Sequence, residues 1–136
     1  MATLFRRILV PHDFSPAADT ALRVAADLAR TNGGKLVVLH AIAPFFAVPE
    51  VPLPATFVPT PELIAQARRR LDECVRPALG PQPPPVRLQV TIAQPLDAIL
   101  EAAATADCIV LATTGRTGLA HLVIGSVAEK VVRHSP

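Results

Sequence analysis

Short apolar runs and stretches of helical periodicity alternate along the first part of the chain. Runs of apolar residues at 8–10 and at 36–42, the second interrupted only by His40, are typical of strands that are buried on both faces. Between these runs, apolar residues recur at helical spacing from residue 17 to residue 29. Ser15 and Pro16 precede this stretch as a cap and a first helical residue, and Gly33 follows it as a stop. We therefore predict a strand, a helix and a second strand.

The same alternation continues after a proline-rich stretch. Thr60 and Pro61 again resemble a cap and a first turn, and predict a helix to about Leu79. Apolar residues alternate with polar ones at 86–90, which favours a strand near the edge of a sheet. The pattern then predicts a helix at 95–104, a strand at 108–112 and a last helix from about residue 126 to about residue 134.

Strands that alternate with helices in this way predict an α/β fold. Such an order implies an open, doubly wound parallel sheet with right-handed crossovers and helices on both faces. With 136 residues and no visible internal repeat, the chain is expected to form a single domain over 1–136. Ligands of such sheets bind beyond the carboxyl ends of the strands, where the strand order reverses. The loops after Val10, Ile42 and Ala112 are therefore the candidate binding loops.

Prolines separate the predicted elements. Eleven of the 15 fall within 44–61 and 77–85. The first cluster is interpreted as a surface loop, because proline is excluded from helix and strand interiors. The second is expected to close the preceding helix.

Charge, hydropathy and cysteine content exclude several classes of protein. Thirteen basic against eleven acidic residues leave a net charge of +2, too little for a nucleic-acid-binding surface. No apolar stretch reaches the roughly 20 residues of a membrane-spanning helix, and no secretory signal is visible. Cys74 and Cys108 form no metal-binding or CxxC pattern, and Cys108 is expected to be a buried, inert thiol. These exclusions favour a cytoplasmic protein without nucleic-acid or membrane partners.

Two glycine sites near the end of the chain are candidates for phosphate binding. Gly115 and Arg116 follow the strand at 108–112, and Gly125-Ser126 precedes the last helix. Glycines let backbone N–H groups approach an anion, and a helix N-terminus adds free donors. The alternative is that Ser126 and Glu129 form only a capping box. The sequence patterns of a Walker loop and of a dinucleotide fingerprint are both absent.

Asp13 follows the first strand and has two interpretations. A carboxylate at a strand's carboxyl end can accept hydrogen bonds from the amine edge of a base or from a ribose hydroxyl. Alternatively, Asp13 only stabilises the N-terminus of the helix that starts at Pro16. The histidines are scattered, and His40 is interpreted as a core residue; no metal ligand set and no catalytic residue is identified.

Three segments, in order, resemble the universal stress protein family. They are 8–15 (ILVPHDFS), the strand with sequence LVVLH at 36–40, and 113–131, which contains TTGRTGL and GSVAEKV. The resemblance covers nearly the whole chain except the proline-rich loop. It is specific because three separate segments match.

The resemblance implies an adenine-nucleotide-binding α/β fold. The ATP-binding branch of that family carries G-x-x-G, nine residues, and G-[ST]; here Ala112 stands at the first glycine, followed by Gly115 and Gly125-Ser126. By resemblance, the ligand is ATP or AMP, with or without Mg²⁺. The implied nucleotide-binding residues are Pro11, Asp13, Ala41, Leu111, Ala112, Gly115, Arg116, Gly125, Ser126 and Val127.

The sequence departs from the family pattern at two points that bear on function. Ala112 adds a methyl group and would be strained at a positive φ, so we expect weakened but not abolished binding. The family normally continues into a fifth strand, which in many members pairs across a homodimer. This strand is absent from the 136 residues, so a C-terminal truncation and an altered dimer are both open.

Three functional hypotheses follow. The first is a small cytoplasmic stress-response module that binds an adenine nucleotide and signals its state to an unknown protein partner. The second is a homodimeric interaction protein that has lost nucleotide binding, as Ala112 would favour. The third is a slow ATP hydrolase, for which no catalytic base is identifiable.

Overall fold

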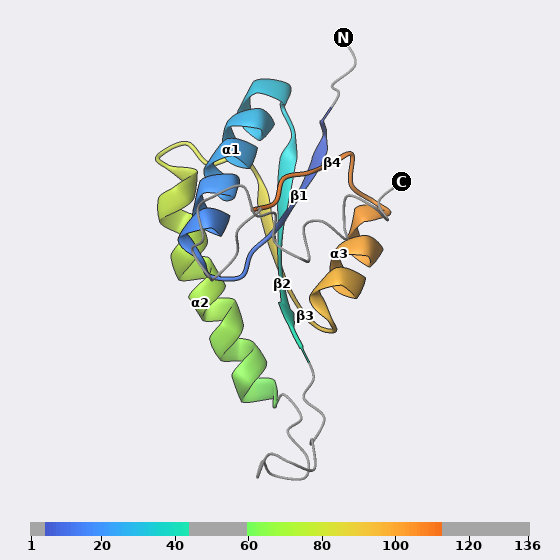
Figure 1. Ribbon diagram of the computed structural model, residues 1–136. Helices are drawn as coiled ribbons and strands as arrows, with labels where there is room; N and C mark the ends of the chain where they lie inside the picture. Colours follow the sequence, from blue (N-terminus) through green and yellow to red (C-terminus); the bar gives the residue numbers. More distant parts are fainter. Residues whose placement is uncertain (1–4, 44–59, 113–136) are drawn as a thin grey trace.

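Four strands and three helices alternate in the computed structural model, which describes residues 5–43 and 60–112 (Figure 1). The elements are β1 (Arg7–Pro11), α1 (Pro16–Asn32), β2 (Lys35–Ile42), α2 (Pro61–Leu79), β3 (Val86–Ile92), α3 (Pro95–Ala103) and β4 (Cys108–Ile109). This order confirms the predicted alternation up to the fourth strand. Residues 44–59 of the predicted proline-rich loop and the predicted last helix lie outside the described residues.

The strands form one parallel sheet in the order β3-β2-β1-β4. Helices α1 and α2 lie on one face of this sheet and α3 lies on the other (Figure 1). The chain proceeds from β1 to β2 to β3 in one direction, and β4 then pairs with the opposite side of β1. The strand order therefore reverses between β1 and β4, and the predicted α/β fold class is confirmed.

The two long helices begin and end where the sequence predicts. In α1, the Ser15 hydroxyl accepts a hydrogen bond from the Ala18 N–H at 3.1 Å, and Gly33 ends the helix with φ of 65°. In α2, the Thr60 hydroxyl accepts from the Leu63 N–H at 3.2 Å. Each cap provides an acceptor for one of the N–H groups that a helix leaves unpaired at its first turn.

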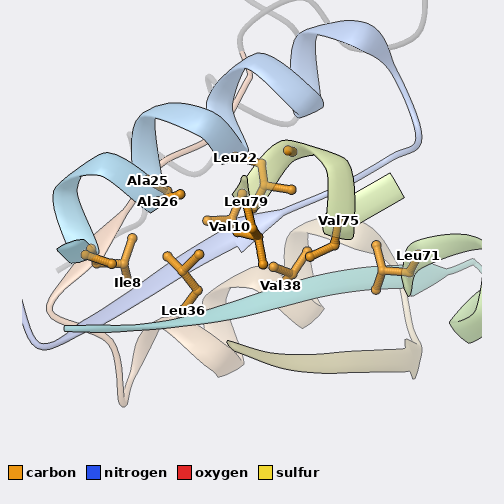
Figure 2. Packing of buried hydrophobic residues seen from close by; sticks show 12 residues of the cluster. Ile8, Val10, Leu22, Ala25, Ala26, Leu36, Val38, Leu71, Val75 and Leu79 are labelled. Carbon is orange, nitrogen blue, oxygen red and sulfur yellow. The ribbon is translucent and has the colours of Figure 1, made fainter. Parts of the chain in front are cut away.

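Alternate residues of the central strands contribute to separate cores. Ile8 and Val10 of β1 face α1 and α2, where they pack with Leu22, Leu36 and Val38. Figure 2 shows these side chains pointing toward one another between the sheet and the two helices. Leu9 points to the other face and packs with Ala98 and Ile99 of α3, among others. The continuous apolar runs at 8–10 and 36–39 thus reflect burial on both faces.

One prediction of an element needs correction, because the strand predicted at 108–112 is assigned only at Cys108–Ile109. Helix α2 ends at Leu79, before Gly80, as predicted, and Pro77 lies inside its last turn. The edge position of β3 is confirmed within the described part of the sheet.

Asp107 attaches β4 to the beginning of β1. Its Oδ2 accepts hydrogen bonds from the backbone N–H groups of Arg6 at 3.1 Å and Arg7 at 3.0 Å. Its own N–H donates to the Arg7 carbonyl at 2.8 Å. These contacts align the start of β4 with β1 and so fix the direction in which the chain reaches the carboxyl edge of the sheet.

The described helices were also considered as membrane spans. None of them combines the length and the apolar character that crossing a bilayer requires.

Candidate functional site

The carboxyl ends of β1, β2 and β4 meet at one edge of the sheet, because the strands are parallel. Pro11 is the last residue of β1 and pairs with Leu39 of β2. The pairing extends one step further, since the His12 N–H donates to the Leu39 carbonyl at 2.8 Å. Ala41 lies two residues beyond Leu39 and therefore at the level of the Asp13 loop.

The chain after β4 approaches the same edge from the other side of β1. Ile109 pairs with Leu9, and the Val110 N–H donates to the Leu9 carbonyl at 3.0 Å. Leu111 and Ala112 continue from this point toward the end of β1. Five of the predicted site residues, Pro11, Asp13, Ala41, Leu111 and Ala112, thus gather at the carboxyl edge, and all five are half-buried. Gly115, Arg116, Gly125, Ser126 and Val127 lie outside the described residues.

Asp13 is held in a turn at the start of α1. Its Oδ1 accepts a hydrogen bond from the Ser15 N–H at 3.0 Å, a local arrangement that Asp side chains favour. This bond agrees with the alternative interpretation, in which Asp13 supports the helix N-terminus. It also fixes the carboxylate at the edge where β1 and β4 diverge, so the two interpretations are compatible.

His12 is a site residue that the sequence analysis did not identify. Its side chain is fully buried, with Nε2 2.9 Å from Asp19 Oδ1 and Nδ1 3.0 Å from the Phe14 nitrogen. A backbone N–H can only donate, so Nδ1 is the acceptor and Nε2 carries the proton that is donated to Asp19. The seven-residue separation of His12 and Asp19 spans the end of β1, a turn and a helix cap. No local periodicity therefore signals the pair.

Phe14 has φ of 67°, and it is the sole non-glycine residue with a positive φ in the described part of the chain. Its ring lies 4.2 Å from the His40 ring, centroid to centroid, and 4.2 Å from the Arg70 guanidinium carbon. His40 is half-buried, and its Nδ1 donates to the His12 carbonyl at 2.8 Å. As predicted, His40 has a hydrogen-bond partner, but it is half-buried and does not belong to the core, and it contacts the loop that carries Asp13.

Ala112 is not strained at the position where the nucleotide-binding pattern has its first glycine. Positive φ is recorded for Gly33, Gly80 and Phe14 within the described residues, and not for Ala112. Its backbone thus adopts a conformation open to any L-residue. The penalty that was expected for alanine at this position does not arise from the backbone.

Neither cysteine thiol is positioned as a nucleophile. Burial raises the pKa of Cys74, and the nearby Asp19 carboxylate raises it further. Burial also raises the pKa of Cys108, with Asp107 adding to the effect. Cys108 is half-buried and not fully buried as predicted. Both thiols are therefore less ionised at neutral pH than an ordinary cysteine.

A cavity of about 300 Å³ lies away from the candidate site, between the sheet and α3. Arg7, Arg87, Gln89 and Glu101 are among the residues that line it. None of the predicted site residues does. Residues 5–43 and 60–112 also contain no group of three or more His, Cys, Asp or Glu side chains arranged to hold a metal ion.

Comparisons with known proteins match nearly the whole chain. The sequence model of the universal stress protein family matches residues 4–136. A universal stress protein of Thermus aquaticus, encoded in the 3' region of a QAH/OAS sulfhydrylase, is 32% identical over 142 residues, which cover 98% of this chain and 95% of that protein.

Two solved structures show the similarity of fold. Universal stress protein UspA from Lactobacillus plantarum superimposes with a TM-score of 0.76 at 24% identity, covering 97% of this chain and 93% of that one. A universal stress protein in complex with cAMP has a TM-score of 0.64 at 22% identity, covering 96% of this chain and 91% of that one.

Proposed function

Because the chain belongs to the universal stress protein family, we propose that it is a small cytoplasmic module that binds ATP or AMP, with or without Mg²⁺. The bound nucleotide determines the state in which the protein meets a protein partner during a stress response. Residues 1–136 act as a single domain, and the protein forms a homodimer. The proposal makes it a binding protein and not an efficient enzyme.

One observation carries this proposal. Asp13 and Ala112 lie on the two sides of the point where the strand order reverses, between β1 and β4. In open parallel sheets this is where nucleotides bind. The solved structure in complex with cAMP, an adenine nucleotide, supports the choice of base, because its fold is similar to that of this chain.

The chemistry of the described residues fits the base and ribose end of such a ligand. An ionised carboxylate only accepts hydrogen bonds, so Asp13 would recognise an amine edge or a hydroxyl. Pro11, Ala41 and Leu111 offer apolar surface for the base. Gly115, Arg116, Gly125, Ser126 and Val127 are proposed to bind the phosphates through backbone N–H groups and the guanidinium.

Titration calorimetry with ATP, AMP and GTP tests the proposal. We expect the wild type to bind ATP and AMP in preference to GTP. Asp13→Ala should weaken ATP binding by about tenfold, the equivalent of one hydrogen bond to a charged group. Asp27→Ala is a matched control, because Asp27 is an exposed carboxylate on α1 that pairs with Arg30 at 3.1 Å. Absence of binding at millimolar ATP, or an equal loss in both variants, would contradict the proposal.

The second candidate is a homodimeric interaction protein that has lost nucleotide binding. The observation that favours it is Ala112 itself, because the methyl group occupies a position that is glycine in the ATP-binding pattern. Ala112→Gly distinguishes the candidates. A gain of ATP binding from none in the wild type would support the second candidate. Slow hydrolysis of bound ATP, the third candidate, would appear as release of phosphate.

A further inference from the structure

The loop between β1 and α1 is organised around the buried imidazole of His12. Only 3% of this residue is exposed. Nδ1 accepts from the Phe14 N–H at 3.0 Å, and Nε2 donates to Asp19 at 2.9 Å. The ring therefore bridges the loop to α1 and uses both of its nitrogens. Only the neutral imidazole can make this pair of bonds, because the imidazolium ion has two donors and no acceptor.

The bond to the Phe14 N–H holds a strained residue. A non-glycine residue in the left-handed region is strained, and Phe14 is such a residue, with φ of 67°. The strain is offset by that hydrogen bond and by the contacts of the Phe14 ring with His40 and Arg70. Strain of this kind persists where surrounding contacts determine one conformation, and it is concentrated at functional sites.

Asp13 lies between the two residues that this bond joins. Its backbone is fixed on one side by His12, which pairs with Leu39 of β2, and on the other side by Phe14. Its side chain is fixed by the bond to the Ser15 N–H. The orientation of the Asp13 carboxylate at the nucleotide edge thus depends on the bond between Phe14 and His12 Nδ1.

We propose that His12 is the positioning residue for Asp13 and that the acceptor at its Nδ1 is required for full adenine-nucleotide affinity. This inference rests on the function proposed above. Without an acceptor at this place the Phe14 N–H would be left unpaired in the loop, and the strained turn that carries Asp13 would be released.

Two amide substitutions separate the roles of the two ring nitrogens. In His12→Asn, the side-chain oxygen takes the place of Nδ1 and can accept the hydrogen bond from the Phe14 N–H. In His12→Gln, the longer amide reaches toward Asp19 but leaves no acceptor for Phe14. We expect His12→Gln to lower ATP affinity at pH 7.5 by tenfold or more, about the effect of one hydrogen bond. His12→Asn should restore most of that loss.

Rescue by His12→Asn provides a readout that a purely structural role would not give. If the imidazole only filled space, both amides would lower ATP affinity to a similar extent. If the acceptor at Nδ1 positions Asp13, only His12→Gln should lower it strongly. Thermal melts of both variants confirm that each protein is folded during the measurement.

Nuclear magnetic resonance of the nucleotide-free protein gives an independent test. The Phe14 amide should exchange its hydrogen faster in His12→Gln than in the wild type, and should remain protected in His12→Asn. Equal affinities of the two amide variants, or equal exchange of the Phe14 amide in both, would overturn the inference. Absence of ATP binding by the wild type would instead overturn the proposed function.

Discussion

The backbone of Phe14 gives a prediction at the scale of a single residue. Phe14→Ala removes the ring contacts with His40 and Arg70 but keeps a Cβ at φ of 67°. Phe14→Gly removes the same contacts together with the backbone strain. We therefore expect Phe14→Gly to be more stable than Phe14→Ala by about 1 kcal/mol, although glycine usually destabilises. Urea denaturation measures the difference. If the alanine variant were the more stable, the positive φ would not be a source of strain.

Residue-level chemistry at the site was predictable only where it is encoded locally. Asp13 could be identified because it directly follows an apolar run. His12 could not, because its importance depends on Asp19, which α1 brings back beside it, and on Phe14, whose positive φ has no sequence signal. The contacts of Arg70 with this loop join residues 56 positions apart and arise from the packing of α2 on α1.

The N-caps of α1 and α2 differ in burial, and we therefore expect them to contribute unequally to the free energy of unfolding. Ser15 is 2% exposed, and its hydroxyl bonds the Ala18 N–H. Thr60 is exposed and makes the equivalent bond to Leu63 at 3.2 Å. Removing either hydroxyl should cost stability, typically about 1 kcal/mol. Ser15→Ala should cost more than Thr60→Ala, because water cannot replace the lost acceptor in a buried cap.

Denaturation of the two alanine variants by urea measures these costs. Ser15→Thr and Thr60→Ser are matched controls that retain the capping oxygen, and the second should unfold at nearly the wild-type midpoint. Equal losses in the two alanine variants would mean that burial of the cap is not what determines its contribution.

Most elements were predictable from sequence because their signals are local. The apolar runs of β1 and β2, the caps Ser15 and Thr60, and Gly33 determine elements within a few residues of themselves. The error at β4 occurs where tertiary contacts decide the outcome, because the length of this strand depends on how many of its residues pair with β1. Helix α2 ends at Leu79 as predicted, two residues after Pro77. The Leu79 carbonyl at that end accepts a hydrogen bond from Arg30 of α1 at 3.2 Å.

At the scale of the whole molecule, Asp107 joins distant parts of the chain and gives a further prediction. Asp107→Ala removes the acceptor of the Arg6 and Arg7 N–H groups, and we expect a loss of about 1–3 kcal/mol, as for hydrogen bonds to a charged group. The Val110 amide, which bonds Leu9, should exchange its hydrogen faster. Asp107→Asn keeps one acceptor oxygen and should lose less. Unchanged exchange at Val110 in the alanine variant would show that β4 does not depend on this contact.

The same contact determines when the sheet can be completed during synthesis. Arg6 and Asp107 are separated by 101 positions, and a ribosome that adds about 5–20 residues per second needs roughly 5–20 s to cover that distance. During this interval the side of β1 that later pairs with β4 lacks its partner strand. An open strand edge of this kind can pair with another chain, and β1 contains the buried residues Ile8, Leu9 and Val10. A newly made chain is therefore most exposed to faulty association just before its fourth strand emerges.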